Sequence, residues 1–156
     1  MAIDPNQPPT VQMLWDIEQI KQLKARYFRL VDAKDWEAFA DLFTDDCVHH
    51  LPVDPPPEPL SNADYIASIK VNLANTITVH HGHMPEITLL SDTEAEGTWS
   101  LFDDVQFNPP GGEASRFHGY ARYYETYRKC ADGRWRITSK RNVRPRPTDP
   151  VEVRQG

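Results

Sequence analysis

The stretch "TITVHHGHMPEITLL", Thr76–Leu90, marks the point at which the sequence changes from helical spacing to strand spacing. β-Branched residues are frequent in it, and apolar side chains recur at every second position, as in a half-buried strand. Turn signals such as "SDT" and "ADG", and the longer loop "NPPGGEAS", separate it from three further runs of the same kind. These runs are Glu94–Phe107, Arg116–Cys130 and Arg134–Val143. The second half of the chain therefore predicts an antiparallel meander.

The first half of the chain has the spacing of amphipathic helices. Apolar residues recur at helical intervals over Gln12–Val31, which predicts one long helix. Asp35 can cap a second helix, and Ser61 with Asp64 forms a capping-box-like start to a third. A mostly helical first half followed by a meander predicts an α+β domain in which a curved sheet wraps over three helices.

Composition narrows the classes of protein and partner. The 156 residues fit a single domain, 1–156, with a core of about 12–146 flanked by flexible Pro-rich tails. The net charge is −6 and the basic residues are scattered, which argues against a nucleic acid partner. With neither a secretion signal nor a long apolar run, we expect no membrane contact and a cytoplasmic location. Cys47 and Cys130 are far apart and are expected to be reduced, with no zinc knuckle or disulfide.

One carboxylate breaks the alternation of its predicted strand. In "EGTWSLFDDVQF", Asp103 shares the apolar phase of Trp99, Leu101 and Val105. An unpaired buried charge is costly, so Asp103 needs a partner or a purpose. It is either turned outward by a bulge, a paired core carboxylate, or a site acid.

The histidine run "HHGH" is ambiguous. His81 and His83 share the phase of Ile77 and Val79, whereas His80 does not, so parity alone points to the wrong residue for a lone catalytic His80. A bulge at Gly82, or a sheet covered on both faces, would change this. Alternation also sends neighbouring histidines to opposite faces, and we expect no metal. His49 and His50 could add ligands but are expected to be exposed or to pack in a loop.

The end of the first predicted helix carries two further candidates. Tyr27 lies in the apolar stripe and is by default a core tyrosine. Asp32 follows five residues later, about 140° around an ideal helix, so the two share a site only if the helix ends there. "DAKDW" is consistent with such an end. Asp32 is then either a helix-end carboxylate or the partner of a histidine, whose tautomer it would fix.

Four features together carry a family resemblance: "DIEQIKQLKARYFRLVDAKDW", "VHHGHMPEI", "GTWSLFDD" and "DGRWRITSKRNVR". Over roughly Asp16–Arg146 the chain resembles the SnoaL-like group of the NTF2-like superfamily, with its closest likeness to the bile-acid 7-alpha-dehydratase branch. The resemblance implies an NTF2-like α+β cone, in which a strongly curved, mostly antiparallel sheet encloses three N-terminal helices and a deep apolar cavity. It also places pocket-mouth residues in the loop "LPVDPPPEPLSN".

The resemblance also implies a set of site residues. Tyr27 and Asp32 would project into the cavity opposite His80, and Asp103 and Arg144 match a carboxylate and an arginine on later strands. His81 is then variable and His83 structural. Trp36 and Tyr123 are expected to contact the substrate, because aromatic side chains suit a flat apolar ligand.

The expected function is a cofactor-independent dehydratase acting on a hydrophobic hydroxy-ketone such as a steroid or polyketide. His80 would abstract the proton, Asp32 would orient the imidazole, and Tyr27 would serve as acid or oxyanion donor. No nucleotide-binding motif is present, so we expect no cofactor. Alternatives are a ketosteroid-type isomerase or other eliminase, or a non-catalytic binding or assembly subunit. A homo-oligomer, dimer or trimer, is expected in either case.

Overall fold

The first element is the long helix α1 (Val11–Ala33), which confirms the helix predicted from the apolar spacing of Gln12–Val31. The structure, a computed structural model, describes residues 8–51, 57–144 and the backbone of 149–151. The Thr10 hydroxyl accepts a hydrogen bond from the Met13 amide at 3.2 Å, which satisfies one free N–H group of the first turn. At the other end Lys34 has φ 58°, and its amide bonds back to carbonyls of the last turn. The helix therefore ends at Ala33, one residue after Asp32.

Helices α2 (Trp36–Ala40) and α3 (Asn62–Asn72) begin at the predicted caps. Asp35 Oδ1 accepts from the Ala38 amide at 3.2 Å, and Ser61 Oγ accepts from the Asp64 amide at 3.2 Å. Strands β1 (Phe43–His50) and β2 (Leu60–Ser61) lie between these helices. The expectation of a mostly helical first half missed both strands.

The four runs of the second half form four long strands, as predicted. They are β3 (Thr76–Leu89), β4 (Glu94–Phe107), β5 (Ser115–Lys129) and β6 (Trp135–Val143). The strands run in the order β2-β1-β6-β5-β4-β3, and the short β7 (Asp149–Val151) pairs with β5. All pairs are antiparallel except β1 with β6, so the sheet is mixed. It is also open, with β2 and β3 at its edges, and does not close around the helices.

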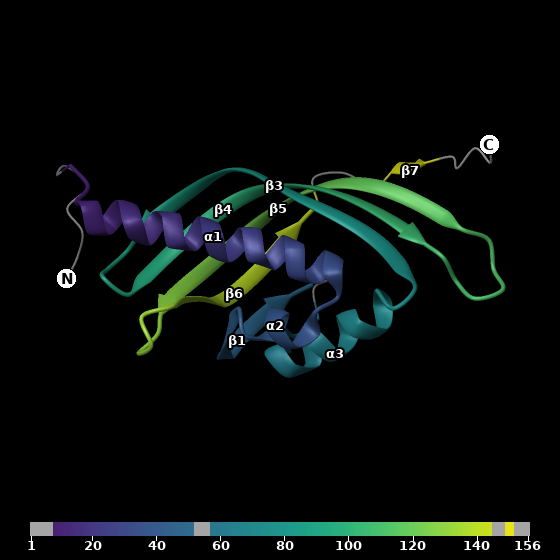
Figure 1. The fold of residues 1–156 in the computed structure, drawn as a ribbon, viewed down its shortest axis with the longest axis horizontal. Helices are drawn as coiled ribbons and strands as arrows, with labels where there is room; N and C mark the ends of the chain where they lie inside the picture. The colour runs from purple at the N-terminus through teal and green to yellow at the C-terminus, as the bar shows by residue number, and fades with distance from the viewer. Residues whose placement is uncertain (1–7, 52–56, 145–148, 152–156) are drawn as a thin grey trace.

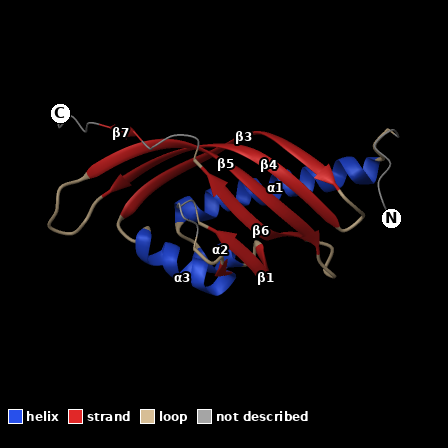
Figure 2. Ribbon diagram, turned by 180° about the vertical axis from the view of Figure 1, so that it is seen from behind, coloured by secondary structure: helices blue, strands red, loops and turns tan. Residues whose placement is uncertain are grey.

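The helices lie on one face of this sheet. Figure 1 shows α1 running across the long strands, with α2 and α3 below it near β1. Figure 2 shows the opposite face, over which the described residues place no helix. Side chains that point toward α1 therefore form the interior, and those that point away form an open outer face.

A bulge in β3 decides which side chains are interior. The pairing of β3 with β4 shifts between His83 and Glu86, and Met84 between them has φ 35°. Ahead of this bulge, Ile77 and Val79 lie on the outer face and are 60% and 44% exposed. The interpretation that they mark the inner phase was wrong. The side chains that point inward are Thr76, Thr78 and His80 before the bulge, and Ile87 and Leu89 beyond it.

The interior contains a charged network as well as apolar side chains. Lys24 Nζ contacts Glu125 Oε1 at 2.5 Å, and both side chains are fully buried. Tyr127 donates to Glu125 Oε2 at 2.6 Å and accepts from Trp99 Nε1 at 2.8 Å. These contacts join α1 to β4 and β5. The surrounding core residues include Ile20, Leu23, Phe39, Leu101 and Ile137.

Some expectations fall partly or wholly outside the described residues. These are the two flexible tails and residues 52–56 of the loop assigned to the pocket mouth.

Cys47 and Cys130 are both free thiols. Of the helices described, none combines the length and apolar content that crossing a lipid bilayer requires.

Candidate active site

Asp32 and His80 form a hydrogen-bonded dyad. Asp32 projects from the last turn of α1, and His80 projects inward from β3. His80 Nδ1 lies 2.6 Å from Asp32 Oδ1, the His80 amide donates to Oδ2 at 3.0 Å, and the Thr78 hydroxyl donates to Oδ1 at 2.8 Å. Because a carboxylate can only accept, Nδ1 carries a proton and Nε2 is left as the base in the neutral ring. The dyad thus has a defined tautomer.

Burial keeps this dyad away from bulk water. The side chains of His80 and Asp32 are 12% and 25% exposed. Burial by itself would raise the pKa of Asp32, but the hydrogen bonds from His80 and Thr78 outweigh it and hold the pKa below its ordinary value. The carboxylate therefore stays ionised at neutral pH and can stabilise a protonated imidazole.

A second charged pair lies beside the dyad. Asp103 is the cross-strand partner of His80 and is 3% exposed. Arg144 contacts it through two nitrogens, Nη1 to Oδ1 at 3.1 Å and Nη2 to Oδ2 at 2.5 Å. Burial lowers the pKa of Arg144, but the bonds to Asp103 raise it overall, so the guanidinium remains charged. Asp103 is thus a paired inward carboxylate next to the dyad, and the outward reading of it was wrong.

Tyr27 lies one aromatic layer away from the dyad. It is 3% exposed, and its hydroxyl lies 3.5 Å from that of Tyr65. The Phe28 ring separates the two groups, at 5.5 Å from the Tyr27 ring and 6.4 Å from His80, on which it stacks. Tyr123 packs edge-on against Tyr27 at 5.9 Å. The structure therefore joins Asp32 and His80 directly, and it places Tyr27 in the neighbouring aromatic cluster.

An apolar hollow of about 360 Å³ opens next to His80. Its lining includes Ala25, Phe28 and Trp99 with Gly82 of β3. A Cβ atom at Gly82 would lie 2.3 Å from Phe28 Cε2, so only glycine lets that ring approach the strand. The hollow gives a ligand access to the imidazole along an apolar wall. Trp36 lies elsewhere and packs against Phe39 at 6.2 Å.

A family model described as a SnoaL-like domain matches residues 12–141. The chain belongs to the SnoaL-like family. This confirms the superfamily that the sequence resembles, while the bile-acid dehydratase branch within it stays a prediction.

Solved structures share the fold of this SnoaL-like chain at low sequence identity. A candidate scytalone dehydratase from Novosphingobium aromaticivorans is 20% identical, with a TM-score of 0.78 over 92% of each chain. A hexachlorocyclohexane dehydrochlorinase, LinA type 2, is 16% identical, with a TM-score of 0.74 over 91% of this chain and 93% of that one. A protein from Planctomyces limnophilus is 20% identical, with a TM-score of 0.73 over 88% and 99%. At these identities the likeness shows the fold.

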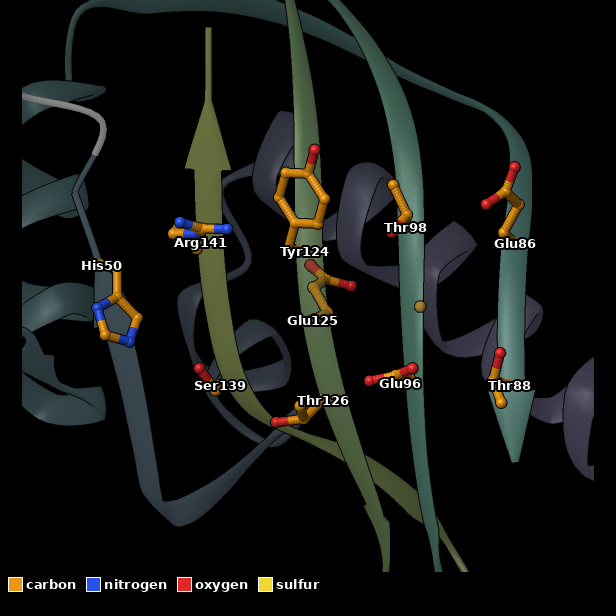
Figure 3. Close-up of a pocket in the computed structure, with 11 residues that line it drawn as sticks. His50, Glu86, Thr88, Glu96, Thr98, Tyr124, Glu125, Thr126, Ser139 and Arg141 are labelled. Atoms are coloured by element: carbon orange, nitrogen blue, oxygen red, sulfur yellow. The ribbon is translucent and has the colours of Figure 1, made fainter. Parts of the chain in front are cut away.

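His49 and His50 of the SnoaL-like chain lie on β1, apart from the dyad, whereas His81 and His83 line the hollow beside His80. His49 is buried, stacks on Tyr65 at 3.9 Å and contacts Asn62 at 3.2 Å. Burial lowers its pKa to about 3, so it is neutral and packs as a structural residue. His50 lines a polar depression of about 620 Å³ on the outer face of the sheet (Figure 3), with Tyr124 and Arg141. Within the described residues, no three His, Cys, Asp or Glu side chains are grouped to hold a metal.

Sequence reasoning missed two residues of the site. Phe28 covers His80, and Gly82 makes room for Phe28. The signal was present, because a glycine within a strand often marks a close approach of another group. It was instead considered as the place of the bulge, which lies two residues later.

Proposed function

We propose that this protein is a cofactor-independent lyase that removes water from a hydrophobic hydroxy-ketone. The observation that carries the proposal is the 2.6 Å contact between Asp32 and His80, with the carboxylate fixed by two further donors. An imidazole held in this way is a general base whose second nitrogen is available to a substrate.

The reaction begins with transfer of a proton from carbon. His80 Nε2 takes the proton next to the substrate carbonyl, and the electron pair of the broken C–H bond moves into an enolate. Asp32 stabilises the imidazolium that forms, because an ionised carboxylate 2.6 Å away favours the charged ring. The enolate then expels the β-hydroxyl group, which accepts a proton and leaves as water. Atoms and charge balance when the imidazolium supplies that proton.

The charged pair beside the dyad suits the oxygen of the carbonyl. Asp103 neutralises Arg144 in part, but the guanidinium has five N–H donors and only two contact Asp103. The remaining donors can bind a carbonyl or carboxylate oxygen of the substrate. Tyr27 is proposed as acid or oxyanion donor on the other side of the Phe28 ring.

We propose a steroid or polyketide ketone as the substrate class, in line with the resemblance to bile-acid dehydratases. The apolar hollow beside His80 has aromatic walls, and its volume of about 360 Å³ lies in the range of small-molecule sites. Tyr123 is a further proposed substrate contact, whereas Trp36, which the sequence also suggested, packs against Phe39 away from this hollow. The names of two structural neighbours, a dehydratase and a dehydrochlorinase, both describe elimination of a small leaving group.

The test is turnover of a panel of hydroxylated ketosteroids and aromatic hydroxy-ketones, followed by mass spectrometry for loss of one water. His80→Ala should lower the rate about 10²-fold to 10⁴-fold, the usual contribution of a general base. His50→Ala, on the outer face of the sheet, is the matched control and should keep the wild-type rate. Folded His80→Ala with unchanged turnover would refute the proposal. A product of unchanged mass with a moved double bond would instead identify an isomerase.

We also propose that the protein is a homo-oligomer assembled through the outer face of its sheet. Ile77 and Val79 of β3 and Tyr120 of β5 are 60%, 44% and 43% exposed on that face. β4 lies between these two strands, and exposed apolar side chains on one face of a sheet favour contact with a second copy. Light scattering after size exclusion should give a dimer or trimer, and Val79→Lys should shift it toward monomer. A monomeric wild-type chain at micromolar concentration would refute this.

A further inference from the structure

A second interior lysine has no carboxylate of its own. Lys140 is 5% exposed and forms no ion pair within the described residues, although Glu125 is its cross-strand partner. Both oxygens of Glu125 are already engaged, one by Lys24 and the other by Tyr127. Two ammonium groups and one carboxylate leave this part of the interior with one excess positive charge. Such a charge is costly to bury without a partner, so its surroundings need an explanation.

Phenol groups surround the Lys140 ammonium. Its Nζ donates to the Tyr65 hydroxyl at 2.8 Å and lies 4.4 Å from the Tyr65 ring centroid. The ring centroids of Tyr123 and Tyr27 are 5.4 Å and 5.8 Å away. His49 stacks on the Tyr65 ring with the centroids 3.9 Å apart and helps to hold that ring in place. The positive charge is therefore stabilised by π faces and one hydroxyl oxygen.

Lys140 also fixes the direction of the hydrogen bonds. An ammonium group has donors only, so the Tyr65 oxygen must accept from it. The nearest hydroxyl oxygen for the Tyr65 proton is that of Tyr27, at 3.5 Å. The Tyr27 proton then points away from Tyr65, where the Tyr123 hydroxyl can accept it until a ligand oxygen takes that place. Each donor in such a chain strengthens the next. Burial raises the pKa of Tyr27 well above its usual value, so this phenol keeps its proton.

We propose that Lys140 is a positioning residue which, through Tyr65, turns the Tyr27 hydroxyl toward a negatively charged ligand oxygen such as an enolate or phenolate. Its charge adds long-range stabilisation of the same oxygen in a low-dielectric interior. The inference rests on the proposed function insofar as the enolate of the dehydration is the natural ligand. The site itself requires only an anionic oxygen on a flat, apolar molecule.

The experiment is a binding titration with 4-nitrophenol, whose neutral and ionised forms have different absorption spectra. The wild-type protein should bind it chiefly as the phenolate. Lys140→Met should weaken phenolate binding about tenfold or more, the usual effect of losing a charge-assisted hydrogen bond. Binding of the neutral phenol should change little. Lys70→Met, which removes an exposed lysine of α3, is the control and should bind as the wild type does.

Two further variants separate positioning from a merely structural role. Lys140→Arg keeps the charge and the donors and should restore part of the phenolate preference. Tyr65→Phe interrupts the chain, and its effect should not add to that of Lys140→Met, because both remove the same path. Replacing an unpaired buried ammonium with methionine should leave thermal stability equal or higher, whereas loss of a structural bond would lower it.

Equal phenolate affinity in the wild type and Lys140→Met would overturn the inference. So would binding of 4-nitrophenol only as the neutral phenol, or no binding of it at all. If Lys140→Met does not fold, the comparison of Tyr65→Phe with the wild type decides in the same way. No turnover enters these measurements, so they remain interpretable even if His80→Ala shows that the dehydration proposal is wrong.

Discussion

Glu125→Gln should destabilise the protein, and by more at low pH than at high pH. Lys24 and Glu125 are fully buried and their charged atoms lie 2.5 Å apart. Glutamine keeps the size of the side chain but removes the negative charge that supports the ammonium. Glu125 opposes the effect of burial on Lys24, so without its charge the pKa of Lys24 should fall further and the variant should hold Lys24 in the neutral form.

The magnitude follows from the pKa of Lys24. Burial lowers this pKa from 10.5 to about 8 even though Glu125 opposes the shift. Each unit corresponds to about 1.4 kcal/mol, so the wild-type protein gives up about 3 kcal/mol of unfolding free energy below pH 8. If the pKa in the variant falls below 6, the penalty at pH 6 rises to about 6 kcal/mol. Loss of the Glu125 charge should therefore lower the unfolding free energy of the variant by about 3 kcal/mol relative to the wild type at pH 6.

The sign of the pH dependence is fixed by proton binding. Above the folded pKa of Lys24 the unfolded chain holds one more proton than the folded one, so stability rises with pH. In Glu125→Gln this rise begins below pH 6, and in the wild type it begins near pH 8. The difference in unfolding free energy between the wild type and Glu125→Gln should therefore shrink by about 1.4 kcal/mol per pH unit up to pH 8 and then remain constant.

Urea unfolding at pH 6, 7, 8 and 9 measures this gap, with the fluorescence of the buried Trp99 and Trp135 as the signal. The double variant Lys24→Met/Glu125→Gln should recover stability, because a neutral pair bears no desolvation penalty. Asp46→Asn breaks an exposed pair and should cost less than about 1 kcal/mol. The reasoning would be refuted if the difference in unfolding free energy were the same at pH 6 and pH 9. It would also be refuted if the double variant were less stable than Glu125→Gln.

Four further predictions, on three variants, concern the site. Asp32→Asn leaves at least one of its donors without an acceptor, and turnover should fall about 10²-fold to 10⁴-fold in steady-state assays. The same variant should lose less stability than the wild type in acid unfolding below pH 4, because the lowered pKa of Asp32 gives stability that disappears as the carboxylate is protonated. Gly82→Ala should force the Phe28 ring off the strand and cost about 1 to 3 kcal/mol of unfolding free energy, with less added cost when Phe28→Leu makes room. Arg144→Lys cannot reproduce the two-nitrogen contact, so KM should rise more than kcat falls.

Local signals explain why most of the fold could be predicted from the sequence. The caps at Asp35 and Ser61 and the period-two pattern of the four long strands depend on neighbours in the chain, and each is found where the sequence indicates. Strand β1 was missed because it reads "FTDDCVHH", in which two aspartates interrupt the alternation. It pairs in parallel with β6, a partner some 90 residues later, and such a pairing leaves no turn signal beside it.

The site was predictable in parts for the same reason. Asp32 was placed by the end of a helix, which is local, and the family resemblance supplied its partner His80. Alternation alone pointed elsewhere, because Ile77 and Val79 were interpreted as core residues. Apolar side chains on an outer sheet face cannot be told from core ones by period. The third expected member, Tyr27, depends on tertiary packing of Phe28 that no spacing encodes.

The bulge at Met84 and Pro85 links these observations. Proline has no N–H to give to the ladder, so it is tolerated in a strand where pairing is already interrupted. Two residues of β3 oppose one residue of β4 at this bulge, and the one extra residue lets His80 and Leu89 face the same interior although they lie an odd number of positions apart. Without the bulge, burying Leu89 would turn His80 to the outer face, away from Asp32. The hydrophobic packing at one end of β3 and the polar dyad at the other are thus compatible only because the strand changes phase between them.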